Sequence, residues 1–311
     1  MNLTAIKSLL IRSPFDLDKH EAYAAWRDWK LTHFPKSVDE LVVEIKNWRS
    51  LTKSEHTAIL DICRRANMAI YVTDGIDNNK DLVAGLGAQF NLVHLDKNLY
   101  SDDDGISALQ VIPGGRRGEY IPYSNRPINW HTDGYYNRLD RKIRAMVLHC
   151  VLPSAVGGEN ALCDHEMVYI LLREMNPKYI AALMQPDAMT IPANIENGTE
   201  VRPLQTGPVF SVDRVTGDLH MRYTARTRSI EWKQDEYTLE AVKNLETLLN
   251  SDSPYIFRHR LGAGQGLFCN NVLHSRTGFV NNPSMGQERL VYRARYYDRI
   301  EGAGVKDYFY Y

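Results

Sequence analysis

The sequence has few cysteines, and no two of them are spaced as a redox or metal-binding pair. Four occur among 311 residues, and no Cys-x-x-Cys motif is present. Such sparse usage argues against a disulfide framework of the kind found in secreted domains. We therefore expect a reducing, cytoplasmic compartment and four buried thiols, at Cys63, Cys150, Cys163 and Cys269.

Long hydrophobic runs and an excess of one charge are also absent. No apolar stretch approaches the roughly 18 residues that a membrane-spanning helix needs. The apolar run at residues 8–11 is too short for the core of a signal peptide. Lys and Arg number 37 against 38 Asp and Glu, so the formal charge is −1. No strong field draws such a chain to nucleic acid or to an anionic membrane, and we expect neither as a partner.

Internal repeats and low-complexity linkers are missing too, which favours one domain over residues 1–311. Composition is that of a globular protein, with 44% hydrophobic and 24% charged residues. Residues 1–50 are expected to form a helical N-terminal extension packed on this domain, with helices at 16–29 and 38–48. A third helix is expected from residue 51 onward.

Short strands dominate the rest of the chain. Helices are expected at 80–90, at 164–184 with an interruption at Pro177, and at 234–249. Many strands, few helices and no βαβ alternation predict a mainly β fold with flanking helices, as a sheet sandwich or open barrel. The expected strands cover residues 68–72, 108–112, 128–132, 145–151, 160–163, 188–191, 209–212, 219–223, 255–260, 266–270 and 289–297.

The motif His131-x-Asp133 lies in one of these expected strands. Alternate side chains of a strand share a face, so the imidazole and the carboxylate should point the same way and could bind one metal ion. The motif is weak alone, because about one such pair arises by chance among ten histidines and 38 acids. Indeed a second copy, His94-x-Asp96, occurs in a polar setting, and we interpret it as an ordinary surface or half-buried pair.

Five downstream histidines are candidates for a third ligand. His149 lies in an apolar strand and is interpreted as a core residue, whereas His165 starts a helix, where a capping or surface role is typical. His220 and His259 lie in expected strands and remain rivals of His274. Two histidines and one carboxylate would form the facial triad of non-haem Fe(II) oxygenases, which leaves coordination positions open.

The neighbourhood of His274 favours it over its rivals. Arg289, Arg293 and Arg295 follow it and share one face of an extended strand. Burying a guanidinium is costly without an anion, and a carboxylate offers bidentate pairing. These arginines therefore indicate a carboxylate-bearing ligand beside the metal, although pairing with Asp or Glu at a sheet edge stays an alternative.

Taken in order, these motifs resemble the TauD/TfdA family of Fe(II)- and 2-oxoglutarate-dependent dioxygenases, which includes taurine dioxygenase. Asn-Trp-His-Thr-Asp around His131 is close to the metal motif of that family. Leu-His-Ser-Arg around His274 resembles the corresponding segment of its γ-butyrobetaine hydroxylase branch, and Gly157-Gly158 lies between them. The resemblance covers about residues 51–299.

The resemblance implies a double-stranded β-helix, or jelly roll, and a role for particular residues. His131, Asp133 and His274 would bind iron, and Arg289 would pair with the distal carboxylate of 2-oxoglutarate. Arg293 matches a second arginine near substrate and co-substrate. Asn160 stands where the family has a threonine that hydrogen-bonds 2-oxoglutarate, and its amide can donate the same bond.

The implied reaction converts 2-oxoglutarate and O2 to succinate and CO2 while a substrate C–H is hydroxylated. Family halogenases lack the carboxylate ligand, so Asp133 favours hydroxylation, with desaturation or oxidative cleavage left open. The expected substrate is a small polar acid or amino-acid-like metabolite, and homo-oligomerisation is left open. The side chains expected to contact that substrate are Tyr135, Tyr136, Tyr223 and Arg226.

Two other hypotheses compete with the dioxygenase hypothesis. A cupin-type metalloenzyme would keep the jelly roll without using 2-oxoglutarate, but it would leave Arg289 and Arg293 without an anion. A non-catalytic ligand-binding sensor could retain a vestigial site, although a complete triad argues against it.

Overall fold

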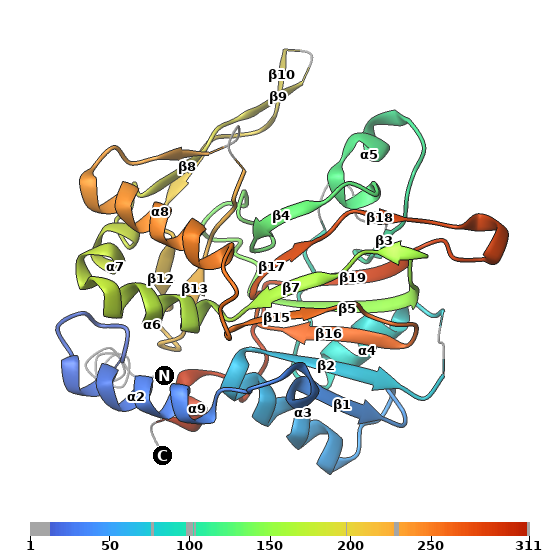
Figure 1. Ribbon diagram of the computed structural model, residues 1–311, viewed down its shortest axis with the longest axis horizontal. Coiled ribbons are helices and arrows are strands. Elements are labelled where there is room, and N and C mark those ends of the chain that lie inside the picture. Colours follow the sequence, from blue (N-terminus) through green and yellow to red (C-terminus); the bar gives the residue numbers. More distant parts are fainter. Residues whose placement is uncertain are drawn as a thin grey trace.

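Two β-sheets of unequal size form the centre of the molecule (Figure 1). This computed structural model describes residues 13–309 except 76–77, 98–101, 103, 197 and 227–229. The larger sheet contains, in spatial order, β1 (Val42–Ile45), β2 (Met68–Thr73), β16 (Gln265–Cys269), β5 (Ala145–Leu152), β19 (Leu290–Tyr296) and β3 (Ser107–Leu109). The smaller sheet contains β15 (Ile256–His259), β7 (Asn160–Cys163), β17 (Leu273–Arg276) and β4 (Ile128–His131). The fold is mainly β with flanking helices and a jelly-roll core, as predicted.

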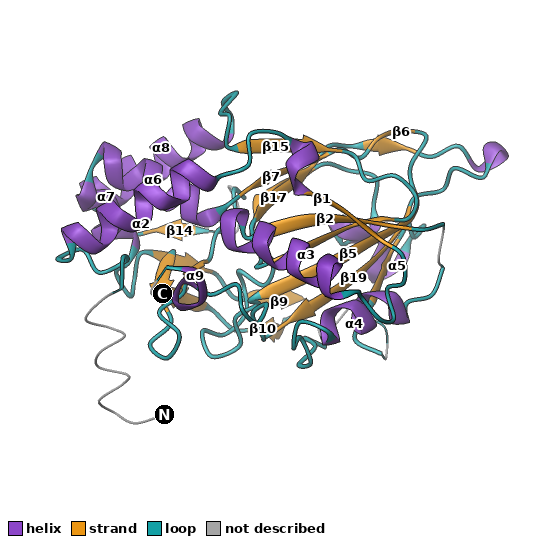
Figure 2. Cartoon of the chain, turned by 90° about the horizontal axis from the view of Figure 1, so that it is seen from below, coloured by secondary structure: helices purple, strands orange, loops and turns teal. Residues whose placement is uncertain are grey.

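The central strand β5 is apolar on both faces because the sheet is covered on both sides. From Ala145 to Val151 every residue is buried, which is the pattern of a doubly covered strand rather than of an amphipathic one. Helices α3 (Lys53–Ala66) and α4 (Asp81–Ala88) lie along the outer face of this sheet (Figure 2). The side chain of Thr52 accepts from the backbone N–H of Glu55 in a capping box that starts α3.

A second group of helices packs at one end of the sheets. It consists of α2 (His20–His33), α6 (His165–Met175), α7 (Pro177–Leu183) and α8 (Glu236–Leu249) (Figure 1). The predicted interruption at Pro177 is confirmed, since Pro177 opens α7 and Asn176 caps it by accepting from the N–H of Lys178.

The N-terminal helix α2 is joined to the domain by a buried ion pair. Lys30 is fully buried, and its Nζ lies 2.7 Å from Oδ2 of Asp164 and 2.5 Å from Oε2 of Glu166 at the start of α6. Burial opposes the charge of Lys30, yet the two carboxylates hold its pKa above the ordinary value. The predicted packing of the N-terminal region on the domain thus has a specific anchor.

We expect Lys30→Met to destabilise the protein by about 3–5 kcal/mol, because two buried carboxylates would lose their cation. The pKa of Asp164 is lowered from 3.8: burial raises it, but Lys30 and other partners lower it more. That carboxylate therefore stabilises the fold above about pH 4, and its contribution is lost as pH falls through the folded-state pKa. Without Lys30, burial would dominate and raise the pKa of Asp164. The difference in stability between the variant and the wild type should therefore shrink below about pH 4.

Urea unfolding at pH 7 and below pH 4 measures this difference. The exposed Lys36→Met is the matched control and should change stability by no more than about 0.5 kcal/mol. Equal effects of the two substitutions at pH 7 would contradict the anchor.

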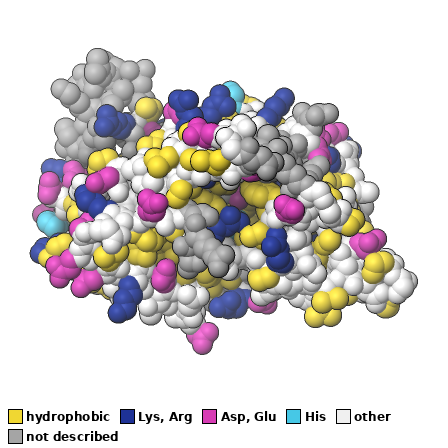
Figure 3. All heavy atoms as spheres, turned by 90° about the horizontal axis from the view of Figure 1, so that it is seen from above, with side chains coloured by type: hydrophobic (Ala, Val, Ile, Leu, Met, Phe, Trp, Pro, Cys, Tyr) yellow, Lys and Arg dark blue, Asp and Glu magenta, His cyan; other side chains and the backbone are white. Residues whose placement is uncertain are grey.

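Smaller elements surround the open end of the jelly roll. A three-stranded sheet, in the order β11–β8–β14, and the β9–β10 hairpin extend from the helical end, and the molecular face on that side is hollowed near its centre (Figure 3). The ranges of these elements are β8 Met189–Ile191, β9 Asn194–Glu196, β10 Thr199–Arg202, β11 Gln205–Gly207 and β14 Glu231–Trp232. The remaining elements are η1 Val38–Leu41, α5 Gly115–Glu119, η2 Ile121–Tyr123, β6 Val156–Gly157, β12 Phe210–Val212, β13 Leu219–Met221, β18 Phe279–Val280, η3 Pro283–Met285 and α9 Val305–Tyr308.

The expected helix at residues 38–48 is wrong. Only one 3-10 turn forms, and Val42-Val43-Glu44-Ile45 then becomes β1, which pairs in parallel with β2. The β-branched side chains suit an extended chain, and a neighbouring strand far along the sequence supplies the hydrogen bonds. The N-terminal extension is therefore part strand, and its first 12 residues lie outside the described ranges.

Several other expectations are confirmed, and some strands were missed. The expected helices at 51 onward, 80–90 and 234–249 correspond to α3, α4 and α8. Strand β17 and the β9–β10 hairpin were not expected. All four cysteines are free and buried. No helix among the described residues is long and apolar enough to cross a membrane.

Candidate metal centre and active site

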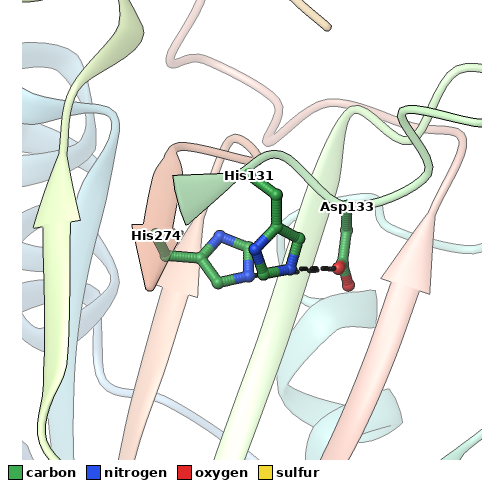
Figure 4. Close-up of side chains that lie close together, drawn as sticks. All are labelled: His131, Asp133 and His274. Carbon is green, nitrogen blue, oxygen red and sulfur yellow. Dashed lines mark ion pairs between the residues drawn. The ribbon is translucent and has the colours of Figure 1, made fainter. Parts of the chain in front are cut away.

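Three side chains that could bind one metal ion meet at the edge of the smaller sheet. His131 ends β4, His274 lies in β17, and the antiparallel register places them directly opposite each other. Oδ1 of Asp133 lies 3.4 Å from Nε2 of His131 and 3.9 Å from Nε2 of His274 (Figure 4). One ligand atom from each residue lies within 4.8 Å of the others. The structure therefore brings the three predicted ligands together.

The reason that His131 and Asp133 point to one place differs from the prediction. Strand β4 stops at His131, and Asp133 lies in the turn that follows. Gly134 continues this turn with φ +67°, and a Cβ there would come within 2.4 Å of Cγ1 of Ile143. The tight turn after the strand, not strand alternation, brings the carboxylate back to the imidazole.

Hydrogen bonds orient both imidazole rings toward the carboxylate. Nδ1 of His131 lies 2.8 Å from the carbonyl of Asn129, and Nδ1 of His274 lies 2.9 Å from the carbonyl of Val272. A carbonyl can only accept, so each Nδ1 carries the proton and donates it. Both Nε2 atoms are then left with the lone pair that a metal ligand needs.

The protonation states of the site also suit a metal ion. Burial would raise the pKa of Asp133, but the charge of Arg293 and the neighbouring His131 hold it well below its usual range. Burial, together with the neighbouring imidazole of His131, lowers the pKa of His274 to about 4. A charged carboxylate and a neutral imidazole are the forms that bind metals.

Asn271 fixes the turn that carries Asp133. Its Oδ1 accepts from the N–H of Asp133 at 2.8 Å, and its Nδ2 donates to the carbonyls of Asp133 at 3.0 Å and of Ile143 at 2.7 Å. On the other side of the turn, the N–H of Thr132 donates to the carbonyl of Tyr223, whose own N–H donates to Oγ1 of Thr132. Asp133 is thus held through its backbone on both sides.

We expect Asn271→Ala to weaken divalent metal binding about 10–100-fold, the usual effect of losing a group that orients a ligand. Asn271 has φ +50°, so Asn271→Gly is the matched variant that relieves the strain without restoring the hydrogen bonds. Metal titration of both variants, alongside urea unfolding, separates orientation from stability. Recovery of wild-type affinity in Asn271→Gly would contradict the orienting role.

The three arginines that the sequence places on one strand face have different partners. Nη1 of Arg293 lies 3.2 Å from Oδ2 of Asp133. Arg295 pairs with buried Asp96 and donates to the hydroxyl of Tyr136. These two therefore pair with carboxylates, as in the alternative left open by the sequence, although Arg293 does so at the metal site itself.

Arg289 has no acidic partner. It is 8% exposed and lies just before β19, and it forms no ion pair with any described residue. Burial lowers its pKa to about 10. Its guanidinium lies 5.2 Å from the ring centroid of Phe279, and Nε lies 3.8 Å from the point where a Cβ of Gly158 would stand. The glycine leaves room beside a buried, unneutralised cation.

Arg276 adds a second cation to this region, and no role was predicted for it. Its guanidinium lies 4.8 Å from the centroid of the Phe279 ring and donates to the carbonyls of Ser124 and Arg126. Burial, then the charge of Arg289, lower its pKa to about 9. Asn160 lies opposite Arg276 in the β7–β17 register, and alternation puts it on the His274 side of the sheet.

A cavity of about 120 Å³ adjoins the metal ligands. Tyr135, Tyr136 and Arg226 line it together with His131 and Asp133, so three of the expected substrate contacts share its wall.

The fourth expected contact, Tyr223, does not line this cavity. It is fully buried and stacks on Trp232 at 6.2 Å, in the core. Its place in the sequence between Met221 and Arg226 suggested a pocket wall, but its side chain packs in the core against Trp232 and not in the cavity. Its backbone instead supports the Asp133 turn.

The rival histidines lie elsewhere. His259 bonds to Gln265, and His149 is buried beside the hydroxyl of Tyr71, as a core residue. His165 is buried and bonds to the carbonyl of Leu219, and Asp164 caps the helix, so neither the capping role nor the surface role expected for His165 is found. His94 is exposed and pairs with Asp298. Among the described residues, His131, Asp133 and His274 are the one group that could hold a metal ion, and His220 is not part of it.

The family of this chain follows from sequence comparison. Residues 72–295 match the family described as "Taurine catabolism dioxygenase TauD, TfdA family", a span that contains the metal site and the arginine strand. The chain belongs to this family. The predicted class is therefore confirmed: the protein is a non-haem iron, 2-oxoglutarate-dependent dioxygenase, with iron and 2-oxoglutarate as its cofactor and co-substrate.

Individual relatives share less of the sequence. A uridine-5'-phosphate dioxygenase from Streptomyces sp. is 26% identical over 202 residues, which cover 63% of this chain and 71% of that protein. Crystal structures of asparagine oxygenase match with a TM-score of 0.57 and 17% identity over 82% of this chain and 81% of that one. The non-heme iron oxygenase OrfP, in complex with Fe and alpha-ketoglutaric acid, matches with a TM-score of 0.55 and 15% identity, covering 78% and 80%. At these identities the structural matches establish the fold.

Proposed function

We propose that the protein hydroxylates an unactivated C–H bond of a small polar metabolite, an acid or amino-acid-like compound, while 2-oxoglutarate becomes succinate and CO2. The observation that carries this proposal is the cluster of His131, Asp133 and His274, two of which line a cavity. The named substrates of the relatives, uridine-5'-phosphate and asparagine, are also polar metabolites.

The residues present fit an iron ion. Both imidazoles are held by carbonyls in the ligand tautomer, and Oδ1 of Asp133 lies 3.4 Å and 3.9 Å from their Nε2 atoms. Two nitrogens and one carboxylate oxygen on one side leave positions open for other ligands. When bound, iron would supply the activation of O2 and the oxidation of the substrate. The chain's own contribution is to fix the ligands and to keep the site dry.

Arg289 is proposed to bind the distal carboxylate of 2-oxoglutarate. A buried guanidinium without an acidic partner is costly unless an anion arrives, and a carboxylate matches its planar donors. Arg276 supplies a second positive charge beside it, and the amide of Asn160 can donate one further hydrogen bond. Arg293, in contact with Asp133, is proposed to orient that carboxylate and to face both substrate and co-substrate.

Tyr135, Tyr136 and Arg226 are proposed to position the substrate. They line the cavity beside the metal ligands, and the two tyrosine rings meet edge to face with centroids 5.1 Å apart. Such a wall offers apolar area, hydroxyl groups and one cation. The presence of Asp133 as a carboxylate ligand supports hydroxylation over halogenation.

Anaerobic mixing of protein, Fe(II) and 2-oxoglutarate tests this proposal. We expect the weak visible charge-transfer band of an iron-bound 2-oxo acid, and then substrate-dependent succinate formation across a panel of metabolites. A cupin-type enzyme would bind Fe(II) without the band. A sensor would give the band or metabolite binding without succinate, and either result would reject the proposal.

A further inference from the structure

A second, larger cavity continues outward from the one at the metal ligands. Its volume is about 480 Å³, and it shares Tyr120, Tyr135, Tyr136 and Arg226 with the inner cavity. The β9–β10 hairpin provides part of its outer wall through Asn194, Val201 and Arg202. Cavities of roughly 300–1,000 Å³ enclose drug-sized ligands, so the combined space exceeds what a free amino acid requires.

The charges that line this outer cavity are unbalanced. Its described lining contains five Lys or Arg side chains but two acidic ones, Asp96 and Glu196. Asp96 is already paired with buried Arg295 and accepts from the hydroxyl of Tyr297 at 2.5 Å. Glu196 accepts from Nδ2 of Asn194 at 2.9 Å. Lys and Arg side chains lie beside the hydrophobic area near the centre of this face, and Asp and Glu side chains lie around it as well (Figure 3).

Arg202 is fixed in this wall without a carboxylate. Its Nη2 donates to the carbonyl of Pro192 at 2.7 Å, and its Nη1 donates to that of Pro203 at 3.3 Å. The guanidinium lies 5.8 Å from the ring centroid of Tyr136. Carbonyls orient the group but do not neutralise it, so it keeps a charge available for a ligand.

Arg226 approaches the same space from the segment after β13. It is half-buried and forms no hydrogen bond or ion pair with the part of the chain that the structure describes. It lines both cavities, so a group bound between Arg226 and Arg202 would lie at the junction of the two. Two half-buried, unneutralised guanidiniums on separate segments are the arrangement that a multiply charged anion stabilises.

We propose that this outer cavity binds a phosphate-type dianion carried by the substrate, with Arg202 and Arg226 as its main contacts. The rest of the substrate would lie along Tyr135 and Tyr136 toward the metal ligands. This inference rests on the proposed function and narrows its substrate from an acid or amino acid to an organic phosphate. A zwitterionic amino acid would bring an ammonium group into a lining in which Lys and Arg outnumber Asp and Glu, whereas a dianion would not.

Three probes that share one aromatic ring but differ in charge test the phosphate site: phenyl phosphate, benzoate and phenol. Each is titrated calorimetrically into the anaerobic Fe(II) protein in the presence of saturating 2-oxoglutarate. We expect phenyl phosphate to bind at least ~10-fold more tightly than benzoate, and benzoate more tightly than phenol. Arg202→Gln and Arg226→Gln should each weaken phenyl phosphate binding ~10-fold or more. The matched control, Arg258→Gln, removes an exposed arginine of β15 that lies outside both cavities and should change phenyl phosphate binding less than ~3-fold.

Equal binding of phenol and phenyl phosphate, or unchanged phosphate binding in both Arg202→Gln and Arg226→Gln, would overturn the inference. Arg226→Gln keeps the test valid if Arg202→Gln disturbs the hairpin. Stronger binding of benzoate would assign the cavity to a carboxylate and would also overturn it. The same titrations run without metal and 2-oxoglutarate report on this cavity even if the charge-transfer band is absent, so failure of the proposed function is seen separately.

Discussion

His274→Ala should abolish tight Fe(II) binding and the charge-transfer band with 2-oxoglutarate. Nε2 of His274 is one of three ligand atoms that lie within 4.8 Å of one another, and its removal leaves one imidazole and one carboxylate. Loss of a group that merely orients a ligand costs about 10–100-fold in affinity, so loss of the ligand itself should cost at least ~100-fold. Anaerobic Fe(II) titration measures the effect.

His259→Ala is the matched control for this experiment. His259 lies in β15 and bonds to Gln265, so its loss should leave Fe(II) affinity within ~3-fold of wild type. The two histidines were rivals in the sequence, and the experiment decides between them directly. Loss of the band in His259→Ala with retention in His274→Ala would contradict the assignment of the third ligand.

Arg289→Gln should weaken 2-oxoglutarate binding on the order of 100-fold, because truncating one partner of a buried charge pair costs about 2–5 kcal/mol. The same substitution should stabilise the protein in the absence of 2-oxoglutarate. Burial without an anion already lowers the pKa of Arg289 to about 10, and a neutral side chain removes that desolvation cost. The variant should therefore lose co-substrate affinity and gain a higher melting temperature.

A loss of 2-oxoglutarate affinity together with a gain in stability distinguishes a binding residue from a structural one. Fe(II) affinity, measured in the same protein, should stay within ~3-fold of wild type, since Arg289 is not among the ligand atoms. Arg258→Gln is the control, because Arg258 is an exposed residue of β15 and should alter neither quantity. Wild-type affinity for 2-oxoglutarate in Arg289→Gln would remove Arg289 from the co-substrate site.

The three candidate metal ligands were predictable because their signal is local. His131 and Asp133 are two residues apart, and His274 is followed by buried arginines that need an anion. Residue type and close spacing carry that information without knowledge of the fold. The turn that directs Asp133 was not predictable, because it depends on Asn271 and Ile143, which come from other parts of the chain.

Other errors have the same origin. Val42 to Ile45 was read as helical because its pairing partner, β2, lies beyond α3 in the sequence. Tyr223 was expected in a pocket wall because its side chain could face either the pocket or the core. Only its packing against Trp232 decides for the core. No role was predicted for Arg202, because a single arginine in a polar segment is ordinary. Only the folded structure places it in the wall of a cavity.

The sequence by itself determined the family, the mainly β architecture and the three candidate metal ligands, since these rest on short motifs and on the period of apolar residues. Tertiary structure alone decided which arginines are neutralised: Arg295 meets Asp96 and Arg293 meets Asp133, whereas Arg289 and Arg226 meet no carboxylate in the described parts of the chain. Charge pairing depends on distances of a few ångströms between residues far apart in the sequence, and folding sets those distances. The arginines left without a partner are the ones proposed to receive the co-substrate and the substrate.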